Sequence, residues 1–535
     1  MRALKPIAYV SDENYVALAE VRADFEPRSG GSVITLNSSA RGAYYDVPPG
    51  AYRVVLSKAG FGAKWVDCEL GGSDPYQFRL LSAQIFGYMW PKWIPAGGQS
   101  EVRVHSPEQY QLTLWRYGLK KEFARMIGWF DEHGPRATEQ ITPDGDYSQT
   151  GVRWNFHGYP SVPVQHFVSA PSRSGLYYLW ARTASGKTFS FPWVVSPAQP
   201  QAKIAVLAST NTWNAYNNFG GRSNYINPGG LPPAPTVNAR LDLERYTSQA
   251  GVWSIPDAEF KPLAFERPES GNHIFDNSPW TDSSITDPIQ GRLQCGQAPA
   301  EWRLLGWLER EGFAYDYYAE AQLHDGTLPL DAYKILILSV HPEYWTRKMF
   351  DQVRHWIEAQ GGRLMYLGGN GVNCEVLLEG DSMRCLSHEE KGNVSGVYES
   401  RMHRTHRSEA GLLGVAFTYS GAMTAAPYRV IDSEHWVFRE TGLNKDDIFG
   451  EKSLHERVPG GASGHETDKI TPSSPSTLRH LAQGVNANRG GADMVYFEQG
   501  KGAVFSVGSI TWTCSLFPDK NISRVTRNVI ERFLQ

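Results

Sequence analysis

The sequence contains few cysteines, and their spacing forms no pairs. Its 535 residues include five, which are scattered and form no Cys-x-x-Cys motif: Cys68, Cys295, Cys374, Cys385 and Cys514. An odd number of isolated cysteines fits reduced thiols better than a disulfide framework or a zinc site. We therefore expect a cytoplasmic protein without disulfide bonds.

Long apolar runs and a strong charge of one sign are also missing. No run of about 18 apolar residues, the length that spans a bilayer, occurs in the sequence. The N-terminal segment MRALKPIAYVSDENY has no apolar centre of the kind found in signal peptides. The formal net charge is −4, and no basic stripe or polybasic segment is present. We therefore expect neither a membrane partner nor a nucleic-acid partner.

Aromatic residues, glycine and proline are plentiful. The chain has 17 Trp, 26 Tyr, 23 Phe, 52 Gly and 33 Pro, and it has no internal repeat. This composition is typical of proteins with many strands and shaped loops. Because the chain is too long for a single hydrophobic core, we expect about two to four domains.

Two β-rich domains are predicted in the first part of the chain. In residues 1–80, Tyr52, Val54 and Leu56 alternate along a strand that follows the turn signal Pro48-Pro49-Gly50. This pattern, V-x-P-G-x-Y-x-V, resembles the transthyretin-like or carboxypeptidase-regulatory β-sandwich, for which we expect a structural role. Residues 81–200 are predicted to form an Ig-like β-sandwich, with a hairpin at 174–197.

After residue 201 the pattern changes to alternating strands and helices. Apolar strands are predicted at 203–210, 314–320, 333–339 and 363–370, a hairpin at 492–512, and amphipathic helices at 301–313, 346–362 and 521–535. This order predicts an α/β domain at 201–535 with a largely parallel sheet covered by helices. Ligands bind beyond the carboxyl ends of such strands, so the loops 211–225, 341–346 and 368–373 should converge on one site.

The segment SVHPEYW (339–345) follows one of these strands and carries a histidine and a carboxylate. Pro342 favours an extended conformation for His341, and in an extended segment His341 and Glu343 face the same way. Such a pair can bind a metal or transfer protons. An ordinary loop pair is the alternative.

Two tyrosines lie in the loop NTWNAYNNFGGRSNY (211–225). Gly220-Gly221 interrupts any helix between Tyr216 and Tyr225, so the loop can fold back and bring both rings together. Both rings can be packing residues, or they can be phenolate ligands. A free phenol has a pKa of about 10 and ionises near neutral pH only where a strong Lewis acid replaces the proton. Phenolate suits ferric iron better than zinc.

Polar residues in two glycine-rich segments complete the set of candidates. YLGGNGVN (366–373) resembles the strand and turn of amidotransferase-like folds, where the turn carries a nucleophilic cysteine; here it carries Asn370, and Cys374 lies beyond it. This disfavours a cysteine hydrolase, while Asn370 can orient an amide or simply tolerate a tight turn. Glu466, in GGASGHETD, is either a general base or a solvated acid.

Five segments together resemble one family, the large (β) subunit of N,N-dimethylformamidase, from about residue 82 to the end: ASTNTWNAYNNFGGRSNY, LLGWLEREGFAYDYYAEAQLH, SVHPEYW, MYLGGNG and GGASGHETDK. The resemblance implies an amidohydrolase with one iron, expected to be ferric. It assigns six residues to this site, with Tyr216, Tyr225 and Glu343 as iron ligands and His341, Asn370 and Glu466 around the metal. A family lysine has three alternative counterparts: Lys391, Arg384 and Arg401.

The expected function is metal-assisted hydrolysis of the C–N bond of a small N-substituted amide or formamide. Glu466 would activate water, His341 would carry protons, and Asn370 would hold the amide. A non-catalytic carbohydrate- or peptide-binding protein on a degenerate scaffold is the alternative. Iron-dependent oxidation is a third class, but the usual two-His-one-carboxylate set is not evident. We expect a homo-oligomer from base rates, and the resemblance implies a small helical partner subunit that this chain does not encode.

Overall fold

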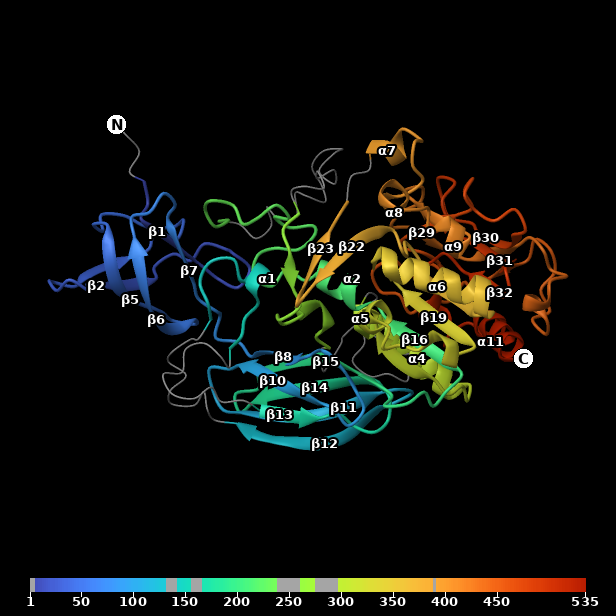
Figure 1. The fold of residues 1–535 in the computed structure, drawn as a ribbon, viewed down its shortest axis with the longest axis horizontal. Coiled ribbons are helices and arrows are strands. Elements are labelled where there is room, and N and C mark those ends of the chain that lie inside the picture. Colours follow the sequence, from blue (N-terminus) through green and yellow to red (C-terminus); the bar gives the residue numbers. More distant parts are fainter. Residues whose placement is uncertain (1–4, 131–141, 155–165, 238–259, 275–296, 388–390) are drawn as a thin grey trace.

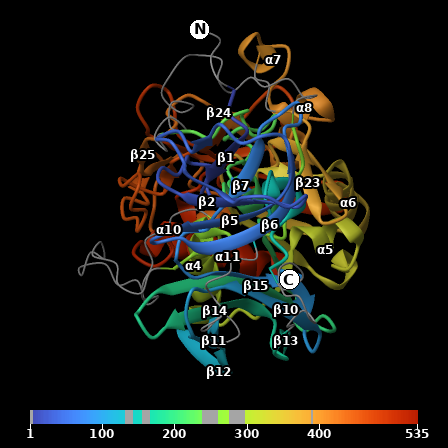
Figure 2. The same ribbon diagram turned by 90° about the vertical axis from the view of Figure 1, so that its left-hand side faces the viewer.

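The computed structural model describes residues 5–130, 142–154, 166–237, 260–274, 297–387 and 391–535 (Figure 1). Three groups of sheets follow one another along the chain, so the protein is multidomain and predominantly β. In the view turned by 90°, the N-terminal strands lie in front and the second group lies below them (Figure 2). No helix in the described ranges is long and apolar enough to cross a membrane.

The N-terminal group has two small sheets, of strand order β3-β2-β5-β6 and β4-β1-β7. Its strands are β1 (Ala8–Ser11), β2 (Arg22–Pro27), β3 (Ile34–Asn37), β4 (Ala43–Tyr44), β5 (Gly50–Lys58), β6 (Gly62–Leu70) and β7 (Tyr76–Arg79). In β5, Tyr52, Val54 and Leu56 are buried and Val55 is exposed, which confirms the predicted alternation. The transthyretin-like type of this domain stays a prediction.

The second group consists of two sheets packed face to face around one core, of order β13-β10-β8 and β12-β11-β14-β15-β9. Its strands are β8 (Phe86–Trp90), β9 (Trp93–Pro95), β10 (Gln99–His105), β11 (Tyr110–Tyr117), β12 (Lys121–Phe130), β13 (His166–Ser169), β14 (Gly175–Thr183) and β15 (Thr188–Ser196). β14 and β15 pair antiparallel, as the hairpin prediction required. The Ig-like assignment and the boundaries at residues 80 and 200 stay predictions.

The third group is built on a nine-stranded sheet of order β18-β16-β19-β21-β32-β31-β30-β26-β27. Its strands are β16 (Ile204–Ala208), β18 (Asp316–Ala319), β19 (Ile335–Val340), β21 (Arg363–Gly368), β26 (Tyr428–Val430), β27 (Ile448–Phe449), β30 (Arg479–Gly484), β31 (Asp493–Gln499) and β32 (Gly502–Ser506). The predicted strands at 203–210, 314–320, 333–339 and 363–370 correspond to β16, β18, β19 and β21.

The prediction of a largely parallel sheet needs correction. Strands β18 to β32 in this order are parallel, but all pairings from β32 to β27 are antiparallel. The physical reason is the short connection at Gly500-Lys501, because two strands joined by a tight turn can pair only antiparallel. Most pairings in the other sheets are also antiparallel, so the amidotransferase-like assignment stays a prediction.

Both faces of the parallel half of the sheet are buried by helices. Ile335 and Ile337 of β19 pack in the cluster of α4 (Gln297–Arg310) and α11 (Lys520–Leu534). Leu336 and Leu338 pack on the other side with α6 (Arg347–Gln360) and α9 (Ala410–Leu413). This double burial explains why the strands are uniformly apolar. The three predicted helices are confirmed, although α4 begins at Gln297 rather than at residue 301.

Short elements connect the longer strands and helices. The small strands are β17 (Leu263–Ala264), β20 (Tyr344–Trp345), β22 (Cys374–Glu379), β23 (Ser382–Cys385), β24 (Ala416–Thr418), β25 (Ala425–Ala426), β28 (Ser463–Gly464) and β29 (Thr467–Lys469). The short helices are α1 (Tyr147–Thr150), α2 (Thr210–Ala215), α5 (Glu320–Asp325), α7 (Lys391–Val394), α8 (Arg401–Thr405) and α10 (Trp512–Ser515), with 3-10 turns η3 (Ser270–Asn272), η4 (Leu330–Ala332) and η5 (Trp436–Phe438).

Candidate active site

His341 and Glu343 project together from the carboxyl end of β19. The His341 Nε2 atom lies 3.0 Å from Glu343 Oε2, so the prediction that the two side chains face the same way is confirmed. The Glu343 side chain is fully buried, and its backbone N–H donates to Thr212 Oγ1 of α2 at 3.0 Å. The strand end and α2 are therefore held together directly beside the carboxylate.

The environment of His341 favours its charged form. Its Nδ1 atom lies 3.0 Å from the carbonyl oxygen of Gly369, which leaves Nε2 to face Glu343 and, at 3.5 Å, Glu466. Burial lowers the pKa of His341, but the carboxylates of Glu466 and Glu343 outweigh this effect and raise the pKa to about 9. At neutral pH the imidazolium can therefore donate from both ring nitrogens.

Tyr216 and Tyr225 meet at Glu343. Their hydroxyl oxygens lie 3.0 Å apart, and Tyr216 and Tyr225 donate to Glu343 Oε2 at 3.0 and 3.2 Å. Gly220 and Gly221 have φ values of 104° and 97°, which confirms the predicted break in the loop. Burial, followed by the charge of Glu343, raises the pKa of both phenols well above the ordinary value. Without a cation the two tyrosines are neutral donors.

The three oxygens fit one face of a metal site. Adjacent ligands at about 2.1 Å from an octahedrally coordinated ion lie about 3 Å apart, and the spacings here are 3.0, 3.0 and 3.2 Å. Two phenols and a carboxylate are hard oxygen donors. Within the described ranges no group of three His, Cys, Asp or Glu side chains could hold a metal ion.

Asn370 and Glu466 border the same pocket. The Asn370 side-chain N–H donates to Glu466 Oε2 at 3.0 Å, and Asn370 has a left-handed φ of 49°. The neighbouring Gly369 lies close to the segment that carries Glu466. A Cβ at Gly369 would lie 2.3 Å from the carbonyl oxygen of Glu466. The structure thus brings all six predicted side chains to one pocket, while their chemical roles stay predictions.

Of the two candidate counterparts of the family lysine whose side chains are described, Arg401 reaches this pocket. Its Nη1 atom lies 3.4 Å from Glu343 Oε1, and Nη2 donates to Tyr419 at 3.0 Å. Arg384 instead pairs with Glu379 in the β22–β23 hairpin, and the side chain of Lys391 lies outside the described part of the structure. The spacing of residues in the sequence does not show which of Arg401, Arg384 and Lys391 lies at the pocket.

Sequence reasoning also missed Thr212 and Tyr344. Thr212 accepts from the backbone of Glu343, and Tyr344 donates to the Tyr225 hydroxyl at 2.8 Å. Both residues lie within motifs that the sequence analysis selected, one before Tyr216 and one after Glu343. Their position in those motifs was the only available signal.

The pocket has a volume of about 540 Å³ and is lined by both polar and apolar side chains. Beyond the polar residues named above, it is lined by Phe417, Ala422, Met423, Ile510, Gln297, Arg457 and His465. Burial lowers the pKa of His465 to about 4, so this imidazole is neutral, and its Nδ1 atom lies 3.2 Å from His455 Nε2. Arg457 is exposed and has no ion-pair partner among the described residues.

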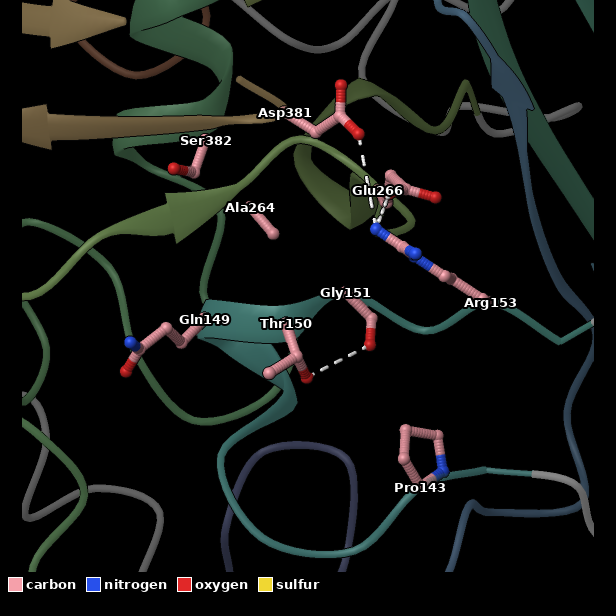
Figure 3. A pocket seen from close by; sticks show the side chains of 9 residues that line it. All are labelled: Pro143, Gln149, Thr150, Gly151, Arg153, Ala264, Glu266, Asp381 and Ser382. Carbon is pink, nitrogen blue, oxygen red and sulfur yellow. Dashed lines mark hydrogen bonds and ion pairs between the residues drawn. The ribbon is translucent and has the colours of Figure 1, made fainter. Parts of the chain in front are cut away.

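A second cavity, of about 430 Å³, lies between the β22–β23 turn, β17 and α1 (Figure 3). Its charged groups satisfy one another, since Arg153 Nη2 lies 2.8 Å from Glu266 Oε1 and 4.0 Å from Asp381 Oδ2. The cavity has no counterpart of the tyrosine pair. The first pocket is therefore the better candidate for chemistry.

These features define a class: a multidomain, predominantly β protein with a buried acid and tyrosine cluster at the carboxyl ends of parallel strands. The chain belongs to the N,N-dimethylformamidase beta subunit family, since residues 124–524 match the family described as N,N-dimethylformamidase beta subunit-like, C-terminal. This confirms the family resemblance.

Two relatives carry the name N,N-dimethylformamidase beta subunit. The protein of Paracoccus aminophilus is 27% identical over 420 residues, which are 68% of this chain and 53% of that protein. The protein of Alcaligenes sp is 26% identical over 295 residues, 46% of this chain and 38% of that protein. The chain thus spans about half the length of the Paracoccus relative.

Solved structures add nothing to this assignment. A Bacteroides uniformis protein proposed to bind carbohydrate overlaps 35% of this chain and 90% of its own, at 12% identity and a TM-score of 0.13. So low a score supports no inference on fold or function.

Proposed function

We propose that this protein is an iron-dependent amidohydrolase that cleaves the C–N bond of an N-substituted amide. The observation that supports this most directly is the triangle of Tyr216, Tyr225 and Glu343 oxygens at 3.0 to 3.2 Å. These residues line a pocket in a member of a family named for an amidase. A carbohydrate- or peptide-binding protein would not need three desolvated acidic groups in contact.

Tyr216, Tyr225 and Glu343 would hold the iron. When bound, ferric iron would supply a Lewis acid and the positive charge that lets the two partly buried phenols ionise. His341 and Arg401 flank the carboxylate at 3.0 and 3.4 Å and limit the negative charge of the site. They lie beside the ligands and are not needed as ligands.

Glu466 and His341 would move the protons. Glu466 is the more accessible carboxylate, with 23% of its side chain exposed against 0% for Glu343, so it can accept a proton from a water in the pocket. The imidazolium of His341, with Nε2 3.5 Å from Glu466 Oε2, can donate a proton to the departing amine. The proton that Glu466 has taken from water can then be transferred to His341. Asn370 fixes the Glu466 carboxylate through its hydrogen bond and presents an amide edge to the pocket.

The pocket favours a substrate larger than dimethylformamide. An amide of about five heavy atoms fills at most about 150 Å³ if each takes the liquid share of a water molecule, whereas the pocket measures about 540 Å³. The additional space is bounded by Phe417, Met423 and Ile510, and Arg457 supplies a cation that pairs with no carboxylate in the part of the chain that the structure describes. We therefore propose an N-acyl or N-formyl compound with an apolar side group and a carboxylate.

Two measurements test this function. Iron per chain is quantified after expression with iron, and released amine is measured for dimethylformamide, N-(2-phenylethyl)formamide and N-formylphenylalanine. We expect about one iron per chain and amine release that Glu466→Gln abolishes. An active chain without iron overturns the metal assignment. An iron-loaded chain that binds these compounds and releases no amine overturns the hydrolase and favours the binding alternative.

The names of the two relatives bear on the quaternary structure. Because both relatives are named as beta subunits, we propose that this chain assembles with a second, smaller chain. Co-expression with the neighbouring reading frames and native mass spectrometry tests this. A fully active homo-oligomer without a second chain overturns it.

A further inference from the structure

The N-terminal sheets reach the loop that carries the two tyrosines. Arg79, the last residue of β7, is fully buried. Both of its terminal nitrogens donate to the carbonyl oxygen of Gly220 at 3.1 Å. On the other side of the same residue, the Gly220 N–H donates to the carbonyl oxygen of Glu13 at 2.6 Å. Both backbone polar groups of Gly220 are therefore satisfied by the N-terminal part of the chain.

Arg79 ties this junction to further backbone. It donates to the carbonyl oxygens of Asp12, at 2.7 and 3.2 Å, and of Gly145, at 2.9 Å. Its guanidinium carbon lies 4.2 Å from the ring centroid of Tyr147, to whose hydroxyl it also donates. None of these guanidinium hydrogen bonds goes to a carboxylate. Burying a guanidinium costs free energy unless its N–H groups are hydrogen-bonded. The planar, rigid arrangement of these N–H groups lets Arg79 donate to several carbonyl oxygens at once.

The loop also packs closely against the N-terminal part of the chain at Gly221. A Cβ at Gly221 would lie 2.4 Å from the Cβ of Tyr15, which belongs to the N-terminal part. Tyr15 also donates to the carbonyl oxygen of Pro232, beyond the loop, at 2.8 Å. Gly220 and Gly221 are the break that lets Tyr216 and Tyr225 face each other. Contacts that hold the backbone of Gly220 and Gly221 in place therefore also help to set the distance between the two phenol oxygens.

We propose that Arg79 is a positioning residue for the tyrosine pair, and that the N-terminal sheets are a structural part of the active site. Arg79 lies outside residues 124–524, the stretch that matches the family. The family match therefore does not account for this contact. The proposal concerns the geometry of the loop and does not depend on which reaction the pocket performs.

Hydrogen–deuterium exchange of the metal-free full-length chain tests the proposal. The readout is the exchange of peptide 211–225 relative to β19 (Ile335–Val340) in the same sample. Arg79→Met removes the donors. Arg79→Lys keeps the charge and the stem, and it tests the proposal if the methionine variant does not fold. Arg22→Met is the matched control, because Arg22 lies in the same part of the chain but is largely exposed and pairs with Asp24.

We expect relative exchange of 211–225 to rise about tenfold or more in the Arg79 variants, since hydrogen bonds from a charged donor hold local structure at least this strongly. Arg22→Met should leave the ratio unchanged. Iron retention after dialysis should fall in parallel. An unchanged ratio in Arg79→Lys and Arg79→Met overturns the proposal, as does an equal rise in the Arg22 control.

Discussion

The hydroxyl oxygens of Tyr216 and Tyr225 lie 3.0 Å apart, although nine positions and a double glycine separate the two residues in sequence. Both phenols are partly buried, and both donate to the same carboxylate oxygen of Glu343. Because the pKa of each phenol is raised beside the ionised Glu343, the two phenols keep their protons unless a cation replaces them. This relationship is the basis of the first prediction.

Replacing one phenol should weaken iron binding without unfolding the chain. Tyr216→Phe or Tyr225→Phe removes one of three oxygens, and we expect at least about 100-fold weaker binding, since even outer contacts of metal sites are worth 10- to 100-fold. Equilibrium dialysis and the visible tyrosinate band measure this. Tyr496→Phe, a half-buried tyrosine on β31, is the control. Iron binding that survives in the Tyr216–Tyr225 double variant contradicts the assignment.

Arg401 should contribute to stability where Arg384 does not. Arg401→Met leaves the fully buried Glu343 with one fewer cationic partner, and we expect the unfolding free energy to fall by about 3 kcal/mol. Arg384→Met, which breaks the more exposed pair with Glu379, should cost about 0.5 kcal/mol or less. Urea unfolding of both variants compares them. Equal losses would show that the Arg401–Glu343 contact is energetically unimportant.

Arg457 should distinguish charged from uncharged amides. If Arg457 contacts a substrate carboxylate, Arg457→Gln should raise the KM for N-formylphenylalanine about tenfold relative to N-(2-phenylethyl)formamide, the loss of one charged hydrogen bond. Arg439→Gln replaces a surface arginine paired with Glu440 and Glu531 and serves as the control. An unchanged KM ratio would remove Arg457 from substrate recognition.

Glu301 should make stability fall as pH rises. Burial raises the pKa of Glu301 to about 7, against the weaker opposing hydrogen bonds from Tyr317, Ser209 and Trp213. The folded chain therefore holds a proton that the unfolded chain releases above about pH 4.5, and this stability is lost as the pH rises through 7.

The neutral variant Glu301→Gln should remove this dependence. Between pH 5 and pH 8 we expect the unfolding free energy of the wild type to fall by about 2 kcal/mol more than that of Glu301→Gln. Denaturant titrations at both pH values measure the difference. The exposed Glu498→Gln should behave like the wild type. Parallel curves for wild type and Glu301→Gln would mean that Glu301 is charged in the folded state.

The parts of the site that follow a strand directly could be predicted from sequence. His341 and Glu343 follow β19 without interruption, and Asn370 follows β21, so the edge of the parallel strands fixes their position. Tyr216 could be placed for the same reason, since only α2 separates it from β16. The periodicity of apolar residues located the strands and helices to within a few residues.

The remaining contacts depend on chain segments that no local pattern connects. Arg401 reaches Glu343 from 58 positions away, and Arg79 reaches Gly220 from 141 positions away. The predicted hairpin at 492–512 corresponds to β31 and β32, but the antiparallel strands beyond it were missed, because apolar strands look alike whether their neighbours run parallel or antiparallel. Only the tight turn before β32 distinguishes the two cases, and it lies at one end of that half.

The hydrogen bond from the Glu343 backbone to Thr212 also has a mechanical consequence. α2 presents Tyr216 at its end, while Thr212 and Asn211 of the same helix hold the backbone of Glu343 and Tyr344 at 3.0 Å each. Motion of α2 would therefore move the Tyr216 phenol and the Glu343 carboxylate together. The distance between their oxygens would change little.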